Sequence, residues 1–210
     1  MKKLILPLLL LVAFGMLAAV ESDPSEVVGY VKYPCVAGLN HLGLPMEQGY
    51  AWASEFADDF PGMMDAMSYW DAATQSWVSA IDLGYWDGDF AIAAGSVLMV
   101  NATGAFNAFS IGDLPATNAS YALLLGLNDI MIPLNRSDIT WAGTAGTEIG
   151  VVDALSYWDN ATQSWVSCID LGYWDGDFPV TIGFPMQVNA YATATWPVRG
   201  AVSPLGTRNK

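Results

Sequence analysis

Apolar and polar residues alternate most regularly in the stretch AMSYWDAATQSWVSAI, residues 66–81. Met67 and Tyr69 fall on one side of this alternation and Ser68 on the other, which is the period of two that a strand requires. Two runs rich in Tyr, Trp, Val and Ile flank a polar turn at residues 71–75. The pattern predicts a β-hairpin.

The pattern also predicts strands on both sides of this hairpin. We expect one or two strands within residues 28–45, one within 94–103 and a last one within 107–115, each bounded by Gly or Pro. Residues 46–62 differ, because Trp52, Phe56 and Phe60 recur every four residues before Pro-Gly. This spacing predicts a short amphipathic helix lying on the sheet.

The chain matches itself after a shift of 88 residues. Residues 65–90 and 153–178 are identical at 23 of 26 positions, and the correspondence runs on without a gap on both sides. We therefore predict a mainly β protein of two tandem β-sandwich-like repeats, residues 28–118 and 119–210, each with a short helix. The second helix should be weaker, because its segment contains two internal glycines.

The two copies differ most where the helix is expected and least in the hairpin and the acidic loop after it. A packed core needs volume and pattern, and it tolerates conservative exchanges. Near-identity that includes polar turn residues exceeds that need. Either the duplication is young in this stretch, or its surface is used.

The first 20 residues have the layout of a secretory signal peptide, with Lys2 and Lys3 before an apolar run and small residues before Glu21. The sequence thus predicts a secreted or cell-surface protein. The remainder is strongly acidic, since the chain has 21 acidic and 7 basic residues and a net charge of −14. This balance argues against nucleic acid and against anionic membrane surfaces as partners.

The chain has two cysteines, Cys35 and Cys168. In an oxidising compartment they are candidates for a disulfide, and the alternative is two buried thiols acting as small apolar groups. Four N-glycosylation motifs begin at Asn101, Asn118, Asn135 and Asn160. Asn160 falls in the predicted hairpin turn, where we expect it to be exposed.

The loop IDLGYWDGDF carries three carboxylates among glycines and is present twice. These six residues are candidate ligands for Ca²⁺, the one cofactor we consider: Asp82, Asp87, Asp89, Asp170, Asp175 and Asp177. The spacing does not match the twelve-residue calcium loop, and Asp and Gly are also ordinary turn residues.

Aromatic residues accompany these carboxylates in both copies. Exposed Trp and Tyr beside Asp suit stacking on sugar rings, and the alternative is that part of this set lies in the core. The candidate contact residues for a glycan or a partner are Tyr69, Trp77, Tyr85, Trp86, Tyr157, Trp165, Tyr173 and Trp174.

Motifs for catalysis are absent from the sequence. His41 is the only histidine, and Asp129 stands at its place in the second copy. The chain has no Gly-x-Ser-x-Gly motif, no His/Cys cluster suited to zinc and no phosphate-binding glycine loop. We expect a protein that is not an enzyme.

The order N-x-L-x-L-P, short helix, YWDxATQSW, DGDF and a glycine before a VLMV strand resembles a repeat module of bacterial secreted and cell-surface proteins. The resemblance covers residues 40–115 and 128–204. It implies an extracellular β-domain and assigns no functional residue.

These observations favour a structural or adhesive surface protein that acts through repeated β-domain contacts. Its partners would be other copies of itself or a cell-surface protein or polysaccharide, reached through strand edges or repeated faces. The alternative is a lectin-like module that uses the duplicated Trp, Tyr and Asp surfaces.

Overall fold

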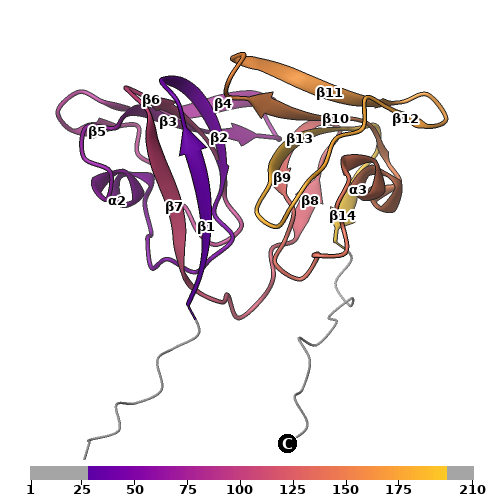
Figure 1. Cartoon of the computed structure of the whole chain (residues 1–210), viewed down its shortest axis with the longest axis horizontal. Coiled ribbons are helices and arrows are strands. Elements are labelled where there is room, and N and C mark those ends of the chain that lie inside the picture. Colours follow the sequence, from indigo (N-terminus) through magenta and orange to yellow (C-terminus); the bar gives the residue numbers. More distant parts are fainter. Residues whose placement is uncertain (1–27, 198–210) are drawn as a thin grey trace, which may run out of the picture.

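The computed structural model describes residues 28–197, in which one order of elements occurs twice (Figure 1). The predicted signal peptide lies outside these residues. The first repeat contains β1 (Val28–Cys35), β2 (Gly38–Gly43), α2 (Ala53–Asp58), β3 (Met64–Asp71), β4 (Ser76–Asp82), β5 (Trp86–Asp87), β6 (Val97–Ala102) and β7 (Phe106–Asp113). The second contains β8 (Tyr121–Leu123), β9 (Gly126–Met131), α3 (Ala142–Ile149), β10 (Val152–Asp159), β11 (Ser164–Asp170), β12 (Trp174–Asp175), β13 (Pro185–Ala190) and β14 (Ala194–Trp196).

Each repeat has one five-stranded and one two-stranded antiparallel sheet. The strand orders are β2-β6-β3-β4-β5 and β9-β13-β10-β11-β12, with β1-β7 and β8-β14 as the smaller sheets. In the predicted hairpin Trp70 pairs with Trp77, and in its copy Trp158 pairs with Trp165. The prediction of a mainly β protein with two tandem repeats and short helices is confirmed.

Each repeat also has a hydrophobic core of its own. In the first repeat Leu42, Met67 and Val100 of the large sheet pack in one cluster with Phe56 of α2 and Ala108 of β7. The helix and the small sheet therefore cover one face of the large sheet, and the second repeat has the equivalent cluster. Because apolar burial is the main driving force for folding, this two-layer arrangement explains why strands and helix recur together.

Both cysteines are core residues in this structure. Cys35 belongs to the first cluster and Cys168 to the second, and both thiols are free. Burial raises the pKa of each thiol to about 11. The candidate disulfide is thus not formed, and the alternative of two buried apolar thiols describes what the structure contains.

The expectation of a weaker second helix is wrong. α3 spans 8 residues and α2 spans 6. Gly143 and Gly146 are buried, and a Cβ at either would lie 2.7 or 2.4 Å from the ring of Trp174. The glycines lower helix propensity, but they let the indole lie directly against the helix, and this packing outweighs propensity.

The gapless alignment of the copies also fails at the helix. Trp52 and Trp141 are both N-cap residues and form equivalent bridges to Ala91 and Pro179, yet they lie 89 positions apart in the chain. Trp52 is 49% exposed instead of lying on the apolar face of the helix. One extra residue before α3 brings Trp52 and Ala53 into register with Trp141 and Ala142, while the rest of the helix segment still differs between the copies.

The two repeats pack against each other with pseudo-twofold symmetry. Tyr33 Oη donates to Gly183 O at 2.9 Å, and Tyr121 Oη donates to Gly95 O at 3.0 Å. Trp70 Nε1 donates to Leu127 O, and its copy Trp158 Nε1 donates to Leu39 O. β2 contacts β10 and β13, while β9 contacts β3 and β6.

Each hairpin turn closes the free edge of the other repeat's large sheet. Gln163 Oε1 accepts from Leu39 N at 2.8 Å, and its Nε2 donates to Leu39 O at 2.9 Å. Gln75 makes the same pair of bonds to Leu127. A side-chain amide here replaces the peptide of a neighbouring strand, so the inner edges β2 and β9 are occupied at these positions.

Residues on the pseudo-twofold axis face their own counterparts. His41 Nε2 and Asp129 Oδ2 lie 3.4 Å apart, and these residues are 88 positions apart in sequence. Gly43 faces Met131 in the same way, since a Cβ on Gly43 would lie 2.7 Å from Met131 Sδ and 2.5 Å from Gly183 O. No side chain fits at Gly43 unless the repeats move apart.

We expect Gly43→Ala to lower the free energy of unfolding by about 1–3 kcal/mol, because the methyl group meets a backbone oxygen that cannot turn away. The measurement is urea unfolding followed by tryptophan fluorescence. Gly104→Ala is the matched control, since nothing lies within 4 Å of a Cβ there. Equal unfolding midpoints for both variants would show that the repeats do not pack this closely.

Candidate functional site: the duplicated aromatic and acidic loops

The duplicated block, residues 65–90 and 153–178, serves two different regions of the molecule. Its hairpin turns lie at the contact between the repeats, through Trp70, Gln75 and their copies. Its loops after β4 and β11 lie at opposite ends of the molecule (Figure 1). The interface accounts for the polar turn residues, so the loops are the part of the block that folding contacts explain least.

Each loop is a tight turn between two paired strands. Asp82 pairs with Trp86 across β4 and β5, and the Asp82 side chain accepts from Gly84 N at 2.8 Å. Gly84 has a φ of +85°, a conformation that glycine adopts without strain. Asp170 and Gly172 repeat this geometry in the second copy.

The tips of these turns project apolar side chains into solvent. Leu83 and Tyr85 are 61% and 65% exposed, and their copies Leu171 and Tyr173 are 63% and 64% exposed. The two tips are thus nearly equal in exposure as well as identical in sequence. Because the Asp82 turn holds the backbone, the loop presents these side chains in a preformed arrangement.

The base of each loop is fixed to the helix by its last carboxylate. Asp89 accepts from Ser54 N at 3.1 Å and from Ser54 Oγ at 2.6 Å, at the N-terminus of α2. Asp177 accepts from Gly143 N at 2.8 Å at the start of α3. Free N–H groups and the helix dipole both favour a carboxylate there.

The six candidate metal ligands therefore have separate surroundings. Asp82 and Asp170 cap turns, Asp89 and Asp177 cap helices, and Asp87 and Asp175 are exposed on two-residue strands. Within residues 28–197 no three His, Cys, Asp or Glu side chains gather as a metal site would require.

The eight candidate aromatic residues are divided between core and surface. Tyr69 and Tyr157 are half-buried against Phe90 and Phe178, with ring centroids 4.9 and 4.7 Å apart. Trp86 and Trp174 are half-buried beneath the tips, and Trp77 and Trp165 are 37% exposed beside the interface. Only Tyr85 and Tyr173 project freely.

A groove adjoins the loop of the second repeat. It has a volume of about 680 Å³ and its lining includes Tyr173, Trp174, Tyr191, Asp170 and Asp177. The Trp174 indole donates to Thr147 Oγ1, and Tyr191 Oη donates to Gly150 O, both at 2.9 Å. The first repeat has Thr103 in place of Tyr191, so this aromatic wall belongs to one copy only.

The hairpin turns contain polar residues that sequence reasoning did not single out. Gln75 and Gln163 have a φ of +53°, and their identity in both copies was the available signal. A hydrogen bond from Thr74 Oγ1 lowers the pKa of Asp71, and Thr162 acts in the same way on Asp159. The carboxylates thereby stabilise the turns that present the glutamines.

Among the glycosylation motifs, the expectation that Asn160 is exposed is wrong. Asn160 is only partly exposed, because its turn lies against the first repeat and its Nδ2 donates to Pro34 O at 3.4 Å. Asn101 Nδ2 donates to Asp65 at 2.7 Å, and Asn118 and Asn135 are half-buried.

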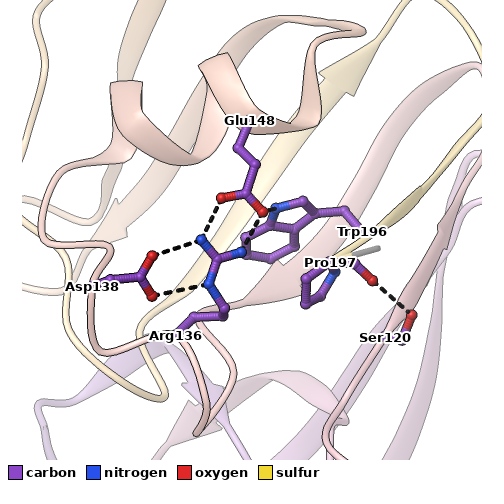
Figure 2. Close-up of polar contacts among 6 residues, drawn as sticks. All are labelled: Ser120, Arg136, Asp138, Glu148, Trp196 and Pro197. Atoms are coloured by element: carbon purple, nitrogen blue, oxygen red, sulfur yellow. Dashed lines mark hydrogen bonds and ion pairs between the residues drawn. The ribbon is translucent and has the colours of Figure 1, made fainter. Parts of the chain in front are cut away.

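The contacts of Arg136 were not predicted from the sequence either. Figure 2 shows its guanidinium between Asp138 and Glu148, with Trp196 Nε1 donating to Glu148 at 3.2 Å. The hydrogen bonds that Arg136 donates to Glu148 and Asp138 raise the pKa of Arg136, and the same bonds to Asp138 lower the pKa of that carboxyl. This cluster joins the β9–α3 connection to α3 and β14, so its role is structural.

Comparison of the chain with protein-family models, curated proteins and solved structures finds no match. The resemblance to a secreted repeat module therefore stays a prediction. Neither helix within residues 28–197 has the length and apolar character needed to cross a bilayer.

We expect Asp89→Ala to lower the free energy of unfolding by about 0.5–2 kcal/mol, the usual cost of removing a helix cap. Asp87→Ala is the matched control, because Asp87 is exposed and two positions away. Thermal unfolding monitored by circular dichroism measures both. If Asp89→Ala unfolds at the same temperature as Asp87→Ala, the loop is not held by the helix.

Proposed function

We propose that this protein is a secreted or cell-surface contact protein without catalytic activity, which joins two partners through identical loops at its two ends. The observation that supports this most is the pair of tips, Leu83 with Tyr85 and Leu171 with Tyr173, because they match in sequence and exposure. Apolar side chains at these positions contribute little to either core.

The arrangement of the loops favours cross-linking over tighter binding to a single partner. Two sites on one chain add avidity only where both can engage one target. Here the loops lie at opposite ends of the molecule (Figure 1), so each is placed to hold a different target.

Charge favours a partner other than a second copy of this chain. The loops carry Asp82, Asp87 and their copies, and Lys32 and Arg136 are the only Lys and Arg residues within 28–197. Arg136 is already held by two carboxylates. A surface that offers basic and apolar groups together complements the tips better than another acidic loop does.

We expect the protein to agglutinate cells of the organism that produces it, because each end holds a different cell. Tyr85→Ala and Tyr173→Ala should each still bind cells but lose agglutination, and the double variant should lose both. Cell binding is measured by sedimentation with cells, and agglutination by light scattering. Binding should weaken as salt rises, since the loops are acidic.

Tyr30→Ala is the control, because Tyr30 is 70% exposed and lies outside the loops. Agglutination by the double variant at the wild-type level contradicts the proposal, as does failure of the wild type to bind cells. Growth of the particle size with protein concentration in the absence of cells would instead indicate self-association.

The second candidate function is carbohydrate binding in the groove of the second repeat. Aromatic faces of Tyr173, Trp174 and Tyr191 beside the carboxylates of Asp170 and Asp177 offer both stacking and hydrogen bonding. This candidate requires one site, because the first repeat lacks the equivalent of Tyr191.

For this candidate we expect Tyr191→Thr to abolish any change in tryptophan fluorescence on titration with a panel of soluble polysaccharides. The substitution installs the residue that the first repeat carries at Thr103, so the fold accommodates it. Thr103→Tyr is the reciprocal control and should leave the response intact. A response that survives Tyr191→Thr would remove the groove as the sugar site.

A further inference from the structure

A cleft lies between the repeats, beside the turn that joins β10 and β11 and away from the end loop that follows β11. Its volume is about 450 Å³. One wall comes from β1, with Val31, Tyr33 and Pro34, and the other comes from the second repeat, with Trp158, Ile182 and Phe184. The lining is mainly apolar and aromatic, and the volume is within the range of small-molecule sites, about 300–1,000 Å³.

The cleft is not a by-product of the pseudo-twofold symmetry. Symmetry places a second cleft around Tyr69, Trp70 and Asp129, and that one measures only about 150 Å³. Some of the residues that differ between the copies line the larger cleft, where Asn160, Thr181 and Ile182 replace three alanines of the first repeat. Asn160 is one of the three substitutions in the otherwise identical block.

Two residues that line the larger cleft have a buried polar atom without a partner among the described residues. These atoms are His41 Nδ1 and Asn160 Oδ1. His41 is 5% exposed, and its other ring nitrogen faces Asp129 at 3.4 Å. In the tautomer that donates Nε2–H to Asp129, the Nδ1 of the imidazole is an acceptor.

A buried acceptor that stays unsatisfied costs about 1–3 kcal/mol. Both orphan atoms are acceptors, so a group that satisfies either of them must donate a hydrogen bond. The ligand that fits is therefore flat and apolar, to lie between Tyr33, Trp158 and Phe184, and carries a hydroxyl or N–H donor.

We propose that this cleft binds a small aromatic molecule with a hydrogen-bond donor, of the phenol or indole class. Asn160 Oδ1 accepts the hydrogen bond from the donor, and the aromatic walls hold the ring. This site is independent of the end loops, and its ligand can be bound while both loops are engaged.

The test uses p-cresol and toluene, which have similar shapes and differ by the hydroxyl donor. Binding to the full chain is measured by saturation-transfer NMR and by titration of tryptophan fluorescence. p-Cresol should bind saturably, and toluene should bind about three- to tenfold more weakly, the ratio that one net hydrogen bond confers. Asn160→Ala should reduce this ratio, and the turn tolerates it because the first copy has Ala72 there.

Thr181→Trp fills the cleft from an exposed position and should abolish p-cresol binding. Ala93→Trp is the matched control at the equivalent exposed position of the first repeat, which lines neither cleft, and should leave binding unchanged. The proposal is overturned if p-cresol and indole both fail to bind saturably. It is also overturned if Thr181→Trp binds p-cresol like the wild type, or if toluene binds as tightly as p-cresol.

Discussion

The contact between the two repeats is the constraint on which the rest of the structure depends. Each large sheet ends in a strand, β2 or β9, whose free edge would otherwise invite pairing with another chain. The hairpin turn of the opposite repeat occupies that edge, through the side-chain amides of Gln75 and Gln163. Each repeat needs the turn of the other to cover its edge strand. This explains why the duplicated turn is polar and nearly identical in both copies.

Symmetry also explains where the two repeats must differ. A residue on the axis meets its own counterpart, so two identical repeats would set Asp against Asp or Met against Met. The chain instead sets His41 against Asp129 and Gly43 against Met131. One pair is complementary in polarity and the other in size, and both penalise pairing of a repeat with its own kind. The interface thus favours one first repeat with one second repeat, which a single chain always supplies.

The features that the sequence predicted are those that local pattern controls. The period of two over residues 66–81 and the Tyr–Trp pairs set the hairpin, and the 88-residue shift set the number of repeats. What remained open depends on contacts between residues far apart in the chain. No local pattern reveals that Asp89 caps α2, or that Gly143 and Gly146 admit Trp174. The aromatic candidates were ambiguous for the same reason, since alternation tells which side chains share a face but not which face is covered.

Some positions of the two copies make equivalent contacts and others do not, and the two repeats can differ in function only at the second kind of position. The turn and the loop base make equivalent contacts in both repeats, so exchanges there would damage both the interface and the helix caps. The groove near Tyr191 and the cleft near Asn160 each involve residues whose counterparts, Thr103 and Ala72, face other surroundings. Substitutions at such positions change one site without disturbing the shared frame. A duplicated scaffold can therefore keep two equal ends while it acquires single sites beside its axis, because exchanges at such positions leave the paired contacts of Gln75 and Gln163 in place.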